Sequence, residues 1–138
     1  KRLAAVLGEQ TALRTWLEAL PNAEHSALLY QGGAAWRVRI AAEVPASTDL
    51  LAAHDDEQLA ALMSDLGGHC LESLTEAFAA AQDDVPTLFI AWTVKGYGLP
   101  FAGHKDNHAG LMNPTQFAAF REAMNVAEGQ EWELLAGL

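Results

Sequence analysis

The sequence predicts an α/β fold, in which this chain forms a helix-rich part of a parallel-sheet domain. Of its 138 residues 51% are hydrophobic, and they recur at helical spacing through much of the chain. Residues 86–92 (PTLFIAW) differ, because they form a short, apolar run directly after a helical segment. Such a run is typical of a strand that a parallel sheet covers on both faces. A helix followed by a strand is half of a βαβ unit.

Residues 1–54 are expected to form a helical N-terminal segment that ends in a linker. Apolar side chains in residues 2–20 follow a helical stripe, and Pro21 ends this helix because proline disfavours helical geometry in the preceding residue. Residues 24–44 fit either a hairpin that turns at Gly32-Gly33 or a helix, and periodicity does not decide between the two. Residues 44–54 are interpreted as the linker.

Residues 55–124 are expected to hold the α/β part of the chain. Asp55 or Asp56 caps a short helix, which ends at Gly67-Gly68. A further helix over residues 71–82, with Leu71, Leu74, Phe78 and Ala81 on one face, then leads through a turn at residues 83–84 into the predicted strand.

A polar, glycine-rich loop follows the predicted strand and leads to the last helix. Asn113 caps this helix and Pro114 occupies its first turn. The helix is expected to reach Met124, with Phe117, Phe120 and Met124 facing inward. Residues 125–138 have no strong pattern and are interpreted as a tail or an inter-domain linker.

The charge of the chain excludes some partners. With 18 acidic and 8 basic residues the formal net charge is −10, which repels phosphate backbones and anionic membranes, so neither nucleic acid nor membrane is an expected partner. No apolar run approaches the roughly 20 residues of a membrane-spanning helix. The single cysteine, Cys70, excludes an internal disulfide and indicates a reducing cytoplasm.

The segment after the predicted strand is the best candidate for a functional site, because open α/β sheets bind ligands beyond the carboxyl ends of their strands. Lys95, His104 and His108 bring groups that donate hydrogen bonds or move protons, and Gly96 and Gly98 permit a tight turn. The two histidines are four residues apart, as in a helical metal pair. Glycines flank them and no HExxH pattern is present, so no metal site is expected in this chain.

The order of these motifs is similar to that in thiamine-diphosphate-dependent enzymes. Gly67-Gly68-His69, an Ala- and Phe-rich helix, the apolar run, residues 93–98 (TVKGYG) and a loop that contains His108 follow one another. The homodimeric pyruvate dehydrogenase component resembles this most, with a GGHD turn and an HTIKGYG run in the same order. Transketolase resembles it more distantly, with two histidines in the loop. The resemblance covers residues 55–124 and corresponds to the C-terminal half of the diphosphate-binding domain.

The resemblance implies that the chain belongs to a larger homodimeric enzyme that uses thiamine diphosphate and Mg²⁺ to decarboxylate a 2-oxo acid. In this family the thiazolium carbanion attacks a ketone carbon, and nearby histidines donate and accept protons. His108 matches the loop histidine that reaches the substrate, and His104 is the second catalytic candidate. The residues expected to bind the cofactor are Lys95, Gly96, Gly98 and His69.

The chain departs from the family pattern at several points. Cys70 stands where the family has Asp, Trp92 stands where it has His, and the metal-binding GDG motif is absent from the 138 residues. Because the chain also opens with Lys1, we expect a cut piece whose metal ligands lie outside it and which alone binds the cofactor weakly and is inactive. Two alternatives stay open: transketolase chemistry on a ketose, and a non-catalytic α/β interaction module.

Overall fold

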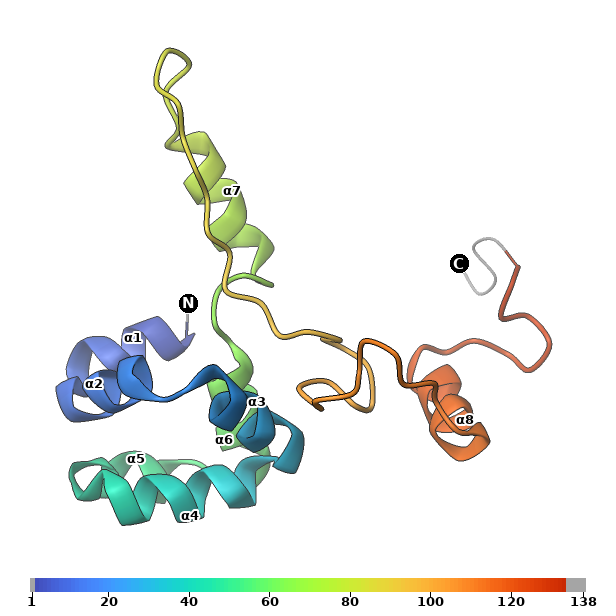
Figure 1. Ribbon diagram of the computed structural model, residues 1–138, viewed down its shortest axis with the longest axis horizontal. Helices are drawn as coiled ribbons and strands as arrows, with labels where there is room; N and C mark the ends of the chain where they lie inside the picture. Colours follow the sequence, from blue (N-terminus) through green and yellow to red (C-terminus); the bar gives the residue numbers. More distant parts are fainter. Residues whose placement is uncertain (1, 134–138) are drawn as a thin grey trace.

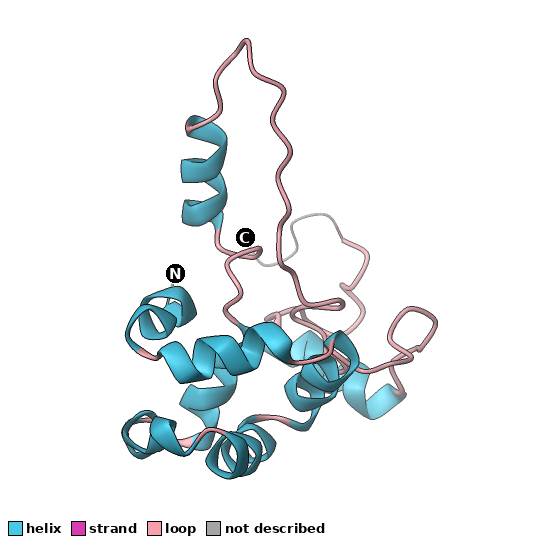
Figure 2. Ribbon diagram, turned by 60° about the vertical axis from the view of Figure 1, so that its left-hand side comes forward, coloured by secondary structure: helices cyan, strands magenta, loops and turns pink. Residues whose placement is uncertain are grey.

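The computed structural model describes residues 2–133, and every regular element in that range is a helix (Figures 1 and 2). In chain order the elements are α1 (Arg2–Glu9), α2 (Thr11–Ala19), α3 (Asn22–Gln31), α4 (Gly33–Glu43), a short 3₁₀ helix (Pro45–Ser47), α5 (Thr48–Ala53), α6 (Asp56–Ser64), α7 (Leu71–Ala79) and α8 (Pro114–Ala123). Of the tail interpreted from the sequence, residues 134–138 lie outside the described residues.

Helices α1 to α6 pack around one hydrophobic core, and α7 and α8 project away from it (Figure 1). Trp36, near the start of α4, is fully buried and packs edge-on against Trp16 of α2, with ring centroids 6.4 Å apart. Burying large apolar side chains is the main favourable contribution to folding. The buried apolar residues of this core are Leu3, Leu13, Leu28, Trp36, Ile40, Val44, Leu50, Leu59, Leu62 and Met63.

The segment that periodicity left open, residues 24–44, is helical except at Gly32 and at Val44, which follows the end of α4. That glycine has φ +85°, a conformation that side chains disfavour, and it separates α3 from α4. The next residue, Gly33, lies against α6 so closely that an added Cβ would be 1.6 Å from the carbonyl oxygen of Asp56. The two glycines therefore allow a sharp helix–helix corner, and no hairpin forms there.

Two expectations for the N-terminal segment are corrected. The helix expected over residues 2–20 is divided at Gln10 into α1 and α2, although Leu20 is extended before Pro21 as expected. The linker interpreted over residues 44–54 is wrong, because most of it is helical and it buries Ser47 and Leu50.

Arg37 and Asp55 fix the way in which α4, α5 and α6 meet. The guanidinium of Arg37 donates to the carbonyl oxygens of Leu51 (2.6 Å) and His54 (2.5 Å) and pairs with Asp56 (2.5 Å). Of the two candidate caps, Asp55 and Asp56, it is Asp55 that caps α6, and it forms a reciprocal capping box with Gln58. One cation thus binds the carbonyls at the C-terminus of α5, where negative partial charge gathers, and the Asp56 carboxylate in the first turn of α6.

The predicted α/β fold with a parallel sheet is wrong for residues 2–133, since this range contains no strand. Residues 86–92 run back along α7 without helical or sheet structure (Figures 1 and 2). A strand exists only where a neighbouring backbone completes its hydrogen-bond ladder, and the neighbour here is a helix that bonds to itself. Within the described residues, the backbone groups of Thr87 to Ala91 make no backbone hydrogen bond.

Helix α7 and the returning segment form an apolar arm, defined here as residues 71–92. The apolar face of α7 is not buried in the core, because Leu71 is 79% exposed and α7 contributes no buried residue. Phe78 and Phe89 pack on each other, with centroids 4.5 Å apart, and hold the two halves together. On α8 the expected inward face is wrong for Phe117 and Met124, which are exposed.

The half-buried imidazole of His25 links core stability to pH. Its ring centroid lies 5.3 Å from that of Trp36 in an edge-on contact, and burial lowers the pKa of His25 below its usual value of 6.5. The unfolded chain therefore binds more protons than the folded chain as pH falls below about 6.5, and folding stability declines. We expect the urea midpoint to be lower at pH 5.5 than at pH 7.5, with a smaller decline in His25→Gln. An equal decline in both proteins would contradict this role.

Candidate functional site

His69 joins two segments that lie far apart in the sequence, the turn at residues 67–70 and residues 93–98. Its Nε2 accepts a hydrogen bond from the backbone N–H of Val94 at 2.8 Å. Its ring stacks on that of Tyr97, with centroids 3.9 Å apart and an interplanar angle of 14°. Two contacts of different kinds therefore hold residues 93–98 against the turn before α7.

Gly68 brings the two backbones together beside this histidine. Its N–H donates to the carbonyl oxygen of Trp92 at 2.9 Å. An added Cβ at Gly68 would lie 2.0 Å from that oxygen, so no other residue fits without moving the chain. The second glycine of the Gly-Gly-His motif is thus required by close approach, and we name the contacts of Gly68 and His69 with residues 92–97 the histidine junction.

Beyond the junction, residues 95–110 form a loop that folds on itself. The carbonyl oxygen of Lys95 accepts hydrogen bonds from the backbone N–H of Gly103 (3.2 Å) and from Nδ2 of Asn107 (2.7 Å). Gly96 has φ +73°, which suits the turn that brings Asn107 back to Lys95. Gly103 contacts α3, where an added Cβ would lie 2.7 Å from the carbonyl oxygen of Ser26.

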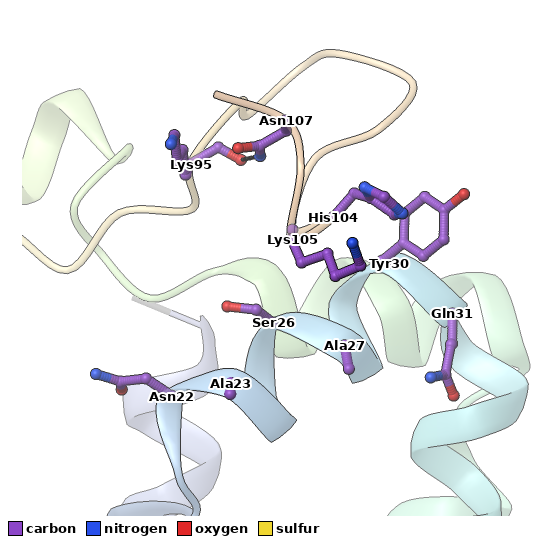
Figure 3. A pocket seen from close by; sticks show the side chains of 11 residues that line it. Asn22, Ala23, Ser26, Ala27, Tyr30, Gln31, Lys95, His104, Lys105 and Asn107 are labelled. Carbon is purple, nitrogen blue, oxygen red and sulfur yellow. Dashed lines mark hydrogen bonds between the residues drawn. The ribbon is translucent and has the colours of Figure 1, made fainter. Parts of the chain in front are cut away.

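A pocket of about 490 Å³ lies between α3 and this loop (Figure 3). Figure 3 shows polar and charged side chains that reach it from both sides. Such a size lies within the range of small-molecule sites, about 300–1,000 Å³. We name it the α3–loop pocket, and it is lined by Asn22, Ala23, Ser26, Ala27, Tyr30, Gln31, Lys95, Gly103, His104, Lys105 and Asn107.

His104 is half-buried in the pocket wall, and His108 is exposed outside it. The ring of His104 meets that of Tyr30 edge-on at 4.6 Å, and its Nδ1 accepts from the backbone N–H of Asp106 at 3.1 Å. This leaves Nε2 of His104 as the ring nitrogen that can carry or exchange a proton. His108 does not line the pocket, so the structure does not bring the two catalytic candidates together in one cavity.

The loop concentrates positive charge in an acidic protein. Lys95 and Lys105 line the α3–loop pocket, and no Asp or Glu does. Lys105 forms an exposed ion pair with its neighbour Asp106. The hydrogen bond that Lys105 donates to the Asp106 carboxylate, together with the charges of Lys105, His104 and His108, lowers the pKa of the Asp106 carboxyl.

The residues expected to bind the cofactor have different environments. Lys95 lines the pocket, Gly96 turns the loop and Gly98 has open space around it. His69 does not line the pocket; its Nε2 and one face of its ring are occupied by the histidine junction. No group of three or more His, Cys, Asp or Glu side chains in residues 2–133 could hold a metal ion. The described residues therefore do not by themselves fit a metal-bound diphosphate.

Sequence reasoning missed the α3 side of the pocket. Asn22, Ser26 and Tyr30 lie four residues apart, a spacing that places side chains on one face of a helix. This polar row was a usable signal. It predicts a common face only if residues 24–44 are helical, and the sequence pattern fits a hairpin equally well.

Comparisons with known proteins identify no relative: no family model, no curated protein and no solved structure matches this chain. Among the described residues, no helix has the length and apolar character needed to cross a membrane. The function must therefore be argued from the motifs and from the geometry of the loop.

Removing the imidazole of His69 should release residues 93–98. In His69→Ala the Val94 amide loses its acceptor and Tyr97 loses its stacking partner, so we expect the Val94 amide to exchange with solvent about tenfold faster. Hydrogen exchange followed by NMR measures this directly. Exchange at Leu59 in the core serves as the internal reference. Unchanged protection at Val94 would show that the histidine junction does not hold the loop.

Proposed function

We propose that this chain is part of a larger thiamine-diphosphate-dependent enzyme that decarboxylates a 2-oxo acid. The observation that carries the proposal is the histidine junction. It unites Gly67-Gly68-His69 with residues 93–98, the two motifs on which the resemblance to this enzyme family rests. His69 and Val94 are 25 residues apart in the sequence. The resemblance rests on the order of the two motifs along the chain, and this contact brings the same two motifs together in space.

In this proposal the chain contributes the loop rather than the metal centre. His69 positions the start of the loop through Val94 and Tyr97, and Lys95, Gly96 and Gly98 shape the turn that faces the cofactor. His104 and His108 donate and accept protons at the substrate, since imidazole titrates near neutral pH. The Mg²⁺ ligands and the rest of the cofactor site belong to other parts of the enzyme.

The exposed apolar side chains of the apolar arm indicate a surface that a partner covers. We propose that this partner is the remainder of the parent enzyme. Leu88 is 85% exposed and Ile90 is 79% exposed, and both lie on a segment whose backbone amides have no backbone partner within residues 2–133. Large contiguous apolar surfaces on soluble proteins mark interaction sites. We further propose a cytoplasmic homodimer, and the free thiol of Cys70 is in keeping with a reducing compartment.

Product analysis of the parent enzyme tests the reaction. We expect the full-length gene product to release CO₂ from pyruvate and to leave a pentose phosphate unchanged. Conversion of the pentose phosphate instead would assign two-carbon transfer of the transketolase type. Turnover of neither substrate would contradict both enzymatic assignments and favour a non-catalytic interaction role.

A further inference from the structure

We propose that Tyr30 is a positioning residue for His104 and that it acts by holding the imidazole against α3. The inference rests on the proposed function in one respect, because it takes His104 to be a residue that moves protons. The placement of the imidazole follows from contacts within this chain and depends on no cofactor or substrate.

The loop meets α3 directly before His104. Gly103 is buried and has φ +80°, and an added Cβ there would lie 2.7 Å from the carbonyl oxygen of Ser26 and 3.3 Å from the backbone nitrogen of Tyr30. The N–H of Gly103 also donates to the carbonyl oxygen of Lys95 at 3.2 Å. The backbone is therefore held close to α3 at the residue from which His104 follows.

Two contacts then restrict the imidazole of His104. Its ring meets that of Tyr30 with centroids 4.6 Å apart and an interplanar angle of 65°, an edge-on geometry that aromatic pairs favour (Figure 3). Its Nδ1 accepts the backbone N–H of Asp106 at 3.1 Å. Asp106 belongs to the same exposed loop, whereas Tyr30 belongs to a helix that contributes Leu28 to the hydrophobic core. Of these two contacts, the one with Tyr30 ties the imidazole to the packed part of the chain.

The contrast with His108 indicates what Tyr30 contributes. His108 belongs to the same loop but is exposed and does not line the α3–loop pocket, whereas His104 is half-buried beside Tyr30 and lines it. A group that transfers protons works only when it is held near its productive geometry, and neighbouring side chains have to supply that restraint. Tyr30 supplies it for His104.

NMR spectroscopy of the 138-residue chain tests the positioning. Three-bond couplings report whether χ1 of His104 has one value or an average over several rotamers. We expect one rotamer in the unmodified chain and in Tyr30→Phe, which keeps the ring, and averaged couplings in Tyr30→Leu, which keeps an apolar side chain without the ring. Because Tyr30 is 49% exposed, both variants should fold. A single rotamer in Tyr30→Leu, or averaging in the unmodified chain, would overturn the proposal.

Kinetics of the parent enzyme test what the positioning does. We expect Tyr30→Leu to lower kcat for a 2-oxo acid about tenfold and to change KM less than about twofold, with kcat retained in Tyr30→Phe. In a His104→Ala background, Tyr30→Leu should cause no further loss, because Tyr30 acts through the imidazole. The same tenfold loss in that background would show that Tyr30 acts on another group, and the proposal would be wrong.

The two experiments separate this proposal from the proposed function. If the unmodified parent does not turn over a 2-oxo acid, the proposed function fails, and the couplings of His104 still decide whether Tyr30 positions it. If the parent is active but the couplings of His104 are the same with and without the ring of Tyr30, the positioning role fails and the proposed function stands.

Discussion

Replacing Trp36 with Ala is expected to lower the free energy of unfolding by about 3–5 kcal/mol. The side chain is 0% exposed and lies at the centre of the core, where Trp16 and His25 contact it edge-on. No neighbour can fill the space of an indole without leaving its own packing, so a cavity remains and the lost contacts are not replaced.

Urea denaturation followed by circular dichroism measures this effect without relying on tryptophan fluorescence. Trp132→Ala is the matched control, because that indole is 97% exposed and its removal should change stability by less than about 0.5 kcal/mol. A loss below 1 kcal/mol in Trp36→Ala would show that α4 is not the centre of the fold.

If the chain belongs to the proposed 2-oxo acid decarboxylase, replacing His108 with Ala in that enzyme is expected to lower kcat by about 100-fold or more. His108 is exposed at the end of the loop that the histidine junction holds, where a substrate from outside this chain can reach it. Losing a group that moves a proton in the transition state should lower kcat and kcat/KM together.

Steady-state kinetics of His108→Ala and His54→Ala provide the comparison. His54 is a histidine at the end of α5, where its Nδ1 contacts the carbonyl oxygen of Leu50, and it takes no part in the loop. We expect His54→Ala to retain the kcat of the unmodified enzyme. If His108→Ala retained more than half of that kcat, the histidine would have no catalytic role.

Local signals predicted the helix boundaries that depend on neighbouring residues. Asp55 and Asn113 both form capping boxes, with Gln58 and Gln116, at the positions where the sequence places helix starts. Such caps are satisfied within one helical turn, so no distant segment can alter them.

Elements that depend on a distant partner were not predictable in this way. Residues 86–92 have the composition of a buried strand, but sheet structure also requires a second strand, and residues 2–133 contain none. The inward face expected for α8 failed for a related reason, because apolar spacing shows that a face exists without showing what covers it. Residues 24–44 are divided into two helices at Gly32, and this corner depends on the contact of Gly33 with Asp56, a residue outside the segment.

In the candidate site, too, features set by neighbouring residues were predictable and contacts between distant segments were not. The glycines, lysines and histidines of residues 95–108 were recognisable from their types and spacing. The contact of His69 with Val94 and Tyr97 was not, because it depends on a chain reversal between α7 and residue 92. The resemblance places His69 among the cofactor-binding residues, which stays a prediction; the structure adds its contacts with Val94 and Tyr97.

Calorimetric titration of thiamine diphosphate with Mg²⁺ into the parent enzyme and into residues 1–138 tests the central claim most directly. On the proposed function the chain supplies the loop and the metal ligands lie elsewhere in the enzyme, so we expect saturable, tight binding to the parent and weak binding to residues 1–138. Tight binding to residues 1–138 alone, or no binding to the parent, would contradict the account.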